Sequence, residues 1–133
     1  MNTIEIYSEF QKQFDEFRGQ YGWLDDMIDN TLDTINCILK QAPNRDFFSK
    51  FSIFIVCEDH HDGYLCFGNL YREFKNVTYE IIIWEDVFGI TKENEQDFEE
   101  VFVKEFSPFE SPRTEDISEF YKVLIPIIDE NET

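Results

Sequence analysis

The sequence predicts an α+β fold in which helices and strands are segregated along the chain. Apolar residues recur every three or four positions near both ends, whereas the middle holds short runs rich in Ile, Val, Phe, Tyr and Trp. No repeat or Gly/Ser-rich linker divides the 133 residues. We therefore expect a single domain over residues 1–133, with two N-terminal helices, a central mainly antiparallel sheet of three or more strands and two C-terminal helices. This order disfavours a doubly wound nucleotide-binding fold.

The first helix is expected over residues 3–18. Its apolar stripe is spaced by four, four, three and four, and consists of Ile6, Phe10, Phe14, Phe17 and Tyr21. Asn2 or Thr3 can cap the start, and Gly19 lies near the end.

A second amphipathic helix follows, with acidic residues in its first turn and Lys40 in its last. Its stripe consists of Leu24, Met27, Ile28, Thr31, Leu32, Ile35, Ile38 and Leu39. Pro43 ends it.

Three strands are predicted in the middle, at Phe51–Cys57, Tyr64–Phe67 and Val77–Trp84. Turn-forming residues separate them, namely Asp62-Gly63, Asn69 and Asn76. In the third strand Val77, Tyr79, Ile81 and Ile83 share the face expected to support helices, and Thr78, Glu80, Ile82 and Trp84 share a mixed face.

The three cysteines are too few for a disulfide scaffold and indicate a reducing compartment. A turn over residues 60–63 places Asp59 opposite Tyr64 and Cys57 opposite Cys66, close enough for a thiol contact or an occasional disulfide. Buried packing is the favoured interpretation for both thiols.

Two helices are predicted after Gly89. Thr91 can cap the first, whose stripe is Phe98, Val101, Phe102 and Phe106 and which Ser107-Pro108 stops. Thr114-Glu115-Asp116 can open the second, which carries Ile117, Phe120, Tyr121 and Leu124 and which Pro126 closes or kinks. Phenylalanines at helical spacing are expected to form the core rather than a cofactor pocket.

The motifs of the common enzyme classes are missing from the sequence. The five glycines form neither a dinucleotide fingerprint nor a phosphate-binding loop. The only histidines, His60 and His61, are adjacent in a predicted hairpin tip, where water is hard to exclude. We therefore expect no enzymatic activity, no catalytic residues and no cofactor.

The segment from Glu58 to Asp62 has the densest set of metal-ligand side chains, and His60 and His61 are the weak metal candidates. Neighbouring side chains of an extended segment point to opposite faces, so the whole set cannot converge on one ion. A solvated polar turn is the favoured interpretation.

The chain carries 29 Asp and Glu against 11 Lys and Arg, a formal net charge of −18. Such a charge disfavours direct binding of nucleic acid or anionic lipid. No apolar run is long enough for a transmembrane helix, and the N-terminus lacks the pattern of a signal peptide, so we expect a soluble cytoplasmic protein.

Two groups of acidic residues predict a protein-binding surface. On the second helix Asp26, Asp29 and Asp33 form one outward edge with Asp25 beside it, and the carboxylates of that edge lie about 4.5 to 6 Å apart along the axis, a spacing that resembles a row of phosphates. Glu85 and Asp86 follow the third predicted strand, and Trp84 or Trp23 can serve as an aromatic anchor.

Solubility alone is one explanation of the charge, because an acidic surface keeps a protein dispersed. The alternative is a docking surface for a basic partner, because complementary charge speeds association and rejects wrong partners. Two functions follow from this alternative: an immunity protein that covers the cleft of a toxin, a nuclease being the favoured class, or a phage-type nucleic-acid mimic that inhibits a CRISPR complex or a restriction enzyme.

One stretch of the chain adds a resemblance. The stretch Tyr79-Glu80-Ile81-Ile82-Ile83-Trp84-Glu85-Asp86 is expected to form a strand that ends in acids, and Gly89-Ile90-Thr91-Lys92-Glu93-Asn94 is expected to lead into a capped acidic helix. With its size and acidity, the chain resembles the small immunity proteins of bacterial contact-dependent inhibition and other polymorphic toxin systems, the CdiI-type proteins. The resemblance implies tight inhibition of one toxin encoded beside the protein and assigns no binding residue.

Overall fold

The computed structural model describes residues 1–60, 63–107 and 110–132. Its elements are, in order, α1 (Thr3–Asp15), α2 (Gly22–Lys40), β1 (Ser52–His60), β2 (Gly63–Phe74), β3 (Val77–Ile83), β4 (Val87–Glu93), β5 (Phe98–Glu105) and α3 (Thr114–Glu132). The α+β class, the two N-terminal helices and the antiparallel sheet are confirmed. The described chain has one C-terminal helix instead of the predicted two.

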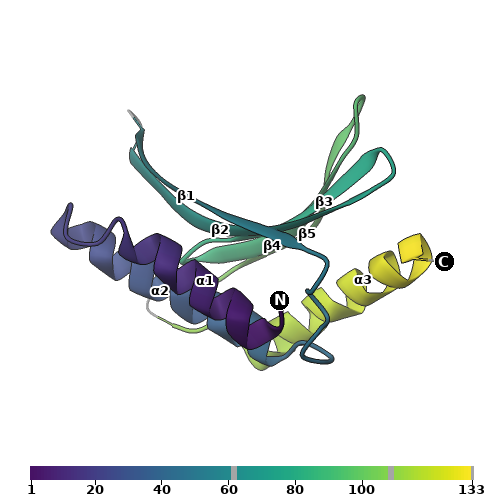
Figure 1. The fold of residues 1–133 in the computed structure, drawn as a ribbon, viewed down its shortest axis with the longest axis horizontal. Helices are drawn as coiled ribbons and strands as arrows, with labels where there is room; N and C mark the ends of the chain where they lie inside the picture. The colour runs from purple at the N-terminus through teal and green to yellow at the C-terminus, as the bar shows by residue number, and fades with distance from the viewer. Residues whose placement is uncertain (61–62, 108–109, 133) are drawn as a thin grey trace.

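The sheet is a meander in which each strand pairs antiparallel with the next, in the order β1-β2-β3-β4-β5. All three helices lie against the same face, and the ends of the sheet turn up away from them (Figure 1). Helices α1 and α2 contact β1, β2 and β3, whereas α3 contacts β5. The described chain therefore forms two layers, with a helix-covered face and an open face of the sheet.

The N-terminal helices follow the sequence patterns closely. The Asn2 side chain accepts a hydrogen bond from the Glu5 amide and the Glu5 side chain accepts one from the Asn2 amide, both at 2.9 Å, which forms a capping box. Helix α1 ends at Asp15, earlier than predicted, and Tyr21 precedes α2 as its N-cap instead of extending the first stripe.

Gly68 of β2 marks the closest approach of the two layers. A Cβ atom at this position would lie 2.9 Å from Ile35 Cδ1 of α2 and 3.0 Å from Phe10 Cε1 of α1. Both of those side chains are fully buried. The absent side chain therefore lets α1 and α2 pack directly on the middle of β2.

The β1–β2 hairpin has the predicted register, with Cys57 opposite Cys66 and Asp59 opposite Tyr64. Both thiols are buried and free. Burial raises the pKa of Cys66 to about 12, with the neighbouring Cys57 as a second cause, so its thiol stays protonated. Asn69 was expected in a turn, but it lies inside β2, which is much longer than predicted.

Residues 91–106 correct the prediction of a helix. They contain the end of β4 and all of β5, joined by a turn in which Asn94 Oδ1 accepts hydrogen bonds from the amides of Gln96 and Asp97, both at 2.8 Å. The register between β4 and β5 shifts between Ile90 and Thr91, which interrupts the alternation of the strand. Phe98, expected in the core, is 62% exposed.

Helix α3 begins at Thr114 as predicted, but it continues through Pro126 to Glu132. The buried Tyr121 hydroxyl donates a hydrogen bond to the carbonyl of Ile38, which joins α3 to α2. Burial raises the pKa of Tyr121 well above its usual value. No helix within the described ranges is both long enough and apolar enough to span a bilayer.

Candidate partner-binding surface

The lysines and arginines of the strands all lie on one face of the sheet, which also carries the acidic residues Asp59 and Glu99. The cations of the strands are Arg72, Lys92 and Lys104, and their register partners include the buried Tyr79 and Phe88. Since directly opposed residues of an antiparallel pair share a face, these cations lie on the helix-covered side. Two of them reach acids of α3: Arg72 contacts Glu132 at 2.6 Å, and Lys104 contacts Asp116 at 3.4 Å.

Carboxylates occupy the opposite face. The glutamates that register places there, here called the open-face glutamates, are Glu58, Glu73, Glu80, Glu93, Glu100 and Glu105. Among the described strand residues, no Lys or Arg shares this face with them. The open face is therefore strongly negative, and of the predicted binding residues Trp84 lies on it.

An apolar strip crosses the same face between the open-face glutamates. Its members are Phe54, Val56, Phe67, Ile82, Trp84, Val87 and Val103. Trp84 packs against Phe67 with ring centroids 4.4 Å apart, and Val103 is 47% exposed. Exposed apolar residues surrounded by polar ones are typical of protein interfaces.

Two hollows indent the open face. The first has a volume of about 280 Å³ and lies at Gly89, which has no side chain; we call it the Gly89 hollow. Its lining residues include Ile82, Trp84, Val103, Glu100 and Glu105. The second, of about 320 Å³, is lined by four glutamates together with Asn76, Thr78 and Asn94. The glutamates of this second hollow are Glu73, Glu80, Glu93 and Glu95.

Asn69 is the one strongly buried amide on the open face, with 1% of its surface exposed. Its Nδ2 donates a hydrogen bond to Glu80 Oε2 at 3.3 Å, but its Oδ1 has no partner within the described chain. A buried acceptor without a donor costs about 1–3 kcal/mol. Asn69 is therefore a buried polar position of the sheet whose acceptor the described chain does not satisfy.

The predicted aspartate edge of α2 is largely engaged in contacts within the chain. Asp29 forms an ion pair with Arg18 at 2.7 Å, Asp25 accepts a hydrogen bond from the Gly19 amide, and Asp33 accepts one from Ser111. Arg18 also pairs with Asp15, and these two carboxylates raise the pKa of its guanidinium. Only Asp26 of the four predicted residues has no such partner in the described part of the chain.

The β3–β4 turn lies next to α2, so the structure brings the two predicted acidic groups together. Asn30 of α2 donates a hydrogen bond to Glu85 Oε2 at 3.4 Å. The Asp86 side chain is exposed, and the Asp86 carbonyl accepts a hydrogen bond from the Phe106 amide. Trp84 precedes this turn and belongs to the open face. The second predicted anchor, Trp23, is 49% exposed and packs 4.8 Å from Tyr64 between ring centroids, at the other side of the sheet.

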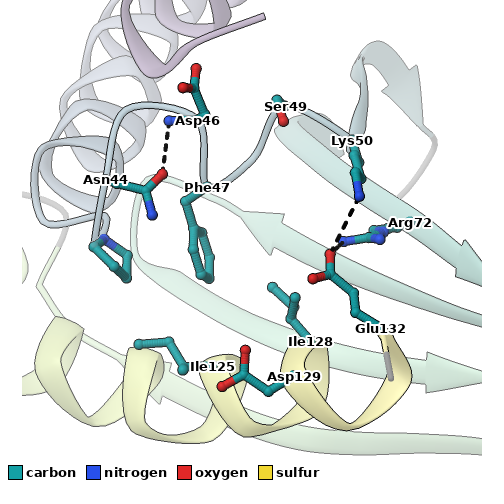
Figure 2. A pocket seen from close by; sticks show the side chains of 11 residues that line it. Asn44, Asp46, Phe47, Ser49, Lys50, Arg72, Ile125, Ile128, Asp129 and Glu132 are labelled. Carbon is teal, nitrogen blue, oxygen red and sulfur yellow. Dashed lines mark hydrogen bonds and ion pairs between the residues drawn. The ribbon is translucent and has the colours of Figure 1, made fainter.

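A cavity of about 370 Å³ lies between the chain that follows α2 and the end of α3 (Figure 2). Lys50 and Arg72 both point at Glu132, at distances of 4.0 and 2.6 Å, and close one side of the cavity. Arg72 also lies 4.3 Å from the centroid of the Phe74 ring. Both cations thus share the Glu132 carboxylate, and these ion pairs join the end of α3 to β2 and to the segment before β1.

No group of three or more His, Cys, Asp or Glu side chains within the described residues is arranged to hold a metal. The metal candidates are not tested, because the side chain of His60 and the whole of His61 lie outside the described residues. No protein-family model, curated protein or solved structure matches this chain. The interpretation of its function therefore depends on its own surface.

Proposed function

We propose that this protein is a non-catalytic acidic inhibitor that binds and neutralises a basic partner protein, and that it acts as the immunity protein of a toxin. The observation that carries the proposal is the composition of the open face, where six glutamates and an apolar strip lie together and no described strand residue is a lysine or arginine. Solubility alone would explain a negative charge spread over the surface. It would not explain why the charge lies beside exposed aromatic residues, which lower solubility.

A nuclease is the toxin class that fits this surface. Its substrate cleft must attract phosphates and is therefore lined with Lys and Arg, the groups that a carboxylate-rich face binds well. The open-face glutamates supply opposite charge, and the apolar strip supplies residues that lose contact with water on binding. A partner covered in this way cannot admit a nucleic acid.

Co-expression with the product of the neighbouring open reading frame tests the proposal. We expect that product to be basic and toxic alone, and to become tolerated and to co-purify when this protein is present. A quadruple variant, E73Q/E80Q/E93Q/E100Q, should lose protection while a matched variant with four amides elsewhere, E16Q/E110Q/E115Q/E119Q, retains it.

A neighbour that stays toxic in the presence of this protein would refute the immunity function. Restored phage plating on a host that carries a CRISPR or restriction system, with no toxic neighbour, would replace it with the mimic function. Equal protection by the two quadruple variants would reject the open face as the source of inhibition.

A further inference from the structure

We infer that the Gly89 hollow is the anchor site for one arginine side chain of the basic partner. This inference rests on the proposed function, and it names the chemical group that the open face recognises. The occupant is an arginine presented by a protein surface.

The shape of the Gly89 hollow suits a long side chain with an apolar stem. Gly89 leaves a gap between Ile82 of β3 and Val103 of β5, which are its register partners on either side. A Cβ atom at Gly89 would lie 2.5 Å from the Phe102 carbonyl oxygen, so the pairing of β4 with β5 keeps this position free of side chains. The methylene groups of an arginine can contact the two aliphatic walls.

The groups at the rim suit the guanidinium at the end of that stem. Trp84 lines the hollow and is held by its contact with Phe67, so it offers a fixed indole for a cation to stack on. Glu100 and Glu105 line the same hollow and are exposed. A planar guanidinium can contact an indole and a carboxylate at once, whereas the compact ammonium of lysine does so less well.

Charge complementarity decides between this occupant and an apolar one. The described strand residues of the open face include six glutamates and no cation, so an apolar side chain in the Gly89 hollow would leave carboxylates beside it without counterions. An anionic group would be repelled. The methylene groups of an arginine can contact the apolar walls of the Gly89 hollow, and its guanidinium can pair with the glutamates at the rim.

The two tryptophans allow the site to be tested without the natural partner. In W23F the tryptophan fluorescence comes from Trp84 alone, which lines the Gly89 hollow. In W84F it comes from Trp23 alone, which lies in a cluster with Tyr21 and Tyr64. Each variant is titrated with a tetra-arginine amide and with a tetra-lysine amide while tryptophan emission is recorded, after circular dichroism has verified the fold.

We expect tetra-arginine to change the Trp84 emission at about threefold lower concentration than tetra-lysine, with little change of Trp23 emission in the same range. In the W23F background, E100Q/E105Q should raise the half-saturating concentration of tetra-arginine about tenfold. The matched variant D26N/D29N removes the same charge from the α2 edge. It should raise the half-saturating concentration of tetra-arginine less than about twofold, because it changes only the long-range electrostatic attraction of the peptide.

Three results would overturn the inference: a Trp23 response at lower peptide concentration than the Trp84 response, equal effects of the two double variants, or no preference for arginine. Because the peptides replace the toxin, these results are independent of the co-expression experiment. A toxin that is neutralised by a protein with an unresponsive hollow would refute the anchor site and leave the proposed function intact.

Discussion

The helix-covered and open faces of the sheet are built from alternate residues of the same strands, yet they follow different rules. On the covered face of β3, Tyr79, Ile81 and Ile83 are buried against the helices. On the open face Ile82 and Trp84 are only half-buried. One face is thus fixed by packing, whereas the other can carry residues chosen for contact with a partner.

Charge shows the same contrast. The covered-face cations Arg72 and Lys104 are paired with carboxylates of α3. Of the six open-face glutamates, Glu80 is the one whose side-chain carboxylate accepts a hydrogen bond within the described chain. Unpaired like charges destabilise a compact state, so the glutamates of the open face contribute less to stability than the paired charges of the covered face.

The sharpest test of this contrast compares two adjacent isoleucines. Ile81→Ala should lower the free energy of unfolding by about 2–5 kcal/mol, because Ile81 is fully buried and a cavity would remain beneath the helices. Ile82→Ala should lower it by about 1 kcal/mol, because less surface is removed from contact.

Urea unfolding of the two variants measures the difference, and the affinity for tetra-arginine should change in the opposite order. Similar losses of stability would show that the open face is part of the structural core.

A second test removes charge from the hollow lined by glutamates. The variant E73Q/E93Q/E95Q should raise the melting temperature by about 2–4 °C at low ionic strength, because three clustered negative charges disappear. The gain should shrink in 1 M salt, where screening acts over about 3 Å.

The control E16Q/E110Q/E119Q removes the same charge from separate exposed positions. A control that gains as much as the clustered variant would show that net charge, and not its concentration on the open face, limits stability.

The sequence predicts one face of the molecule far better than the other. The stripes of α1 and α2 and the alternation of β3 are visible because burial imposes a period on them. The register of Cys57 with Cys66 follows from the position of a single turn. Each of these features has a local cause that can be read from neighbouring residues.

The open face depends on pairing that neighbouring residues do not reveal. Phe98, Phe102 and Phe106 fit a helical period, and the register shift between Ile90 and Thr91 hides the period of a strand. Without β4 and β5 in place, Glu100 and Glu105 cannot be brought beside Trp84. The Asn94 turn was the available signal, since an Asn followed by polar residues favours a hairpin.

The smallest expected effect concerns the ion pair that holds the end of α3 against the covered face. The Arg72 guanidinium lowers the pKa of Glu132 below its usual value, mainly through their hydrogen bond. A carboxyl whose pKa is lower in the folded state stabilises the fold above its unfolded pKa, and this contribution is lost as the pH falls through the folded pKa.

Glu132→Gln should therefore reduce stability at pH 7, and the deficit should shrink as the pH falls through the lowered pKa of the folded-state carboxyl, because the wild-type carboxyl then becomes protonated in both states. Urea midpoints measured from pH 7 to pH 3 test this, with the exposed Glu119→Gln of the same helix as control. A deficit that persists unchanged at low pH would mean that Glu132 acts through packing in the cavity beside α3. In that case charge pairing would not distinguish the covered face from the open one at this end of the sheet.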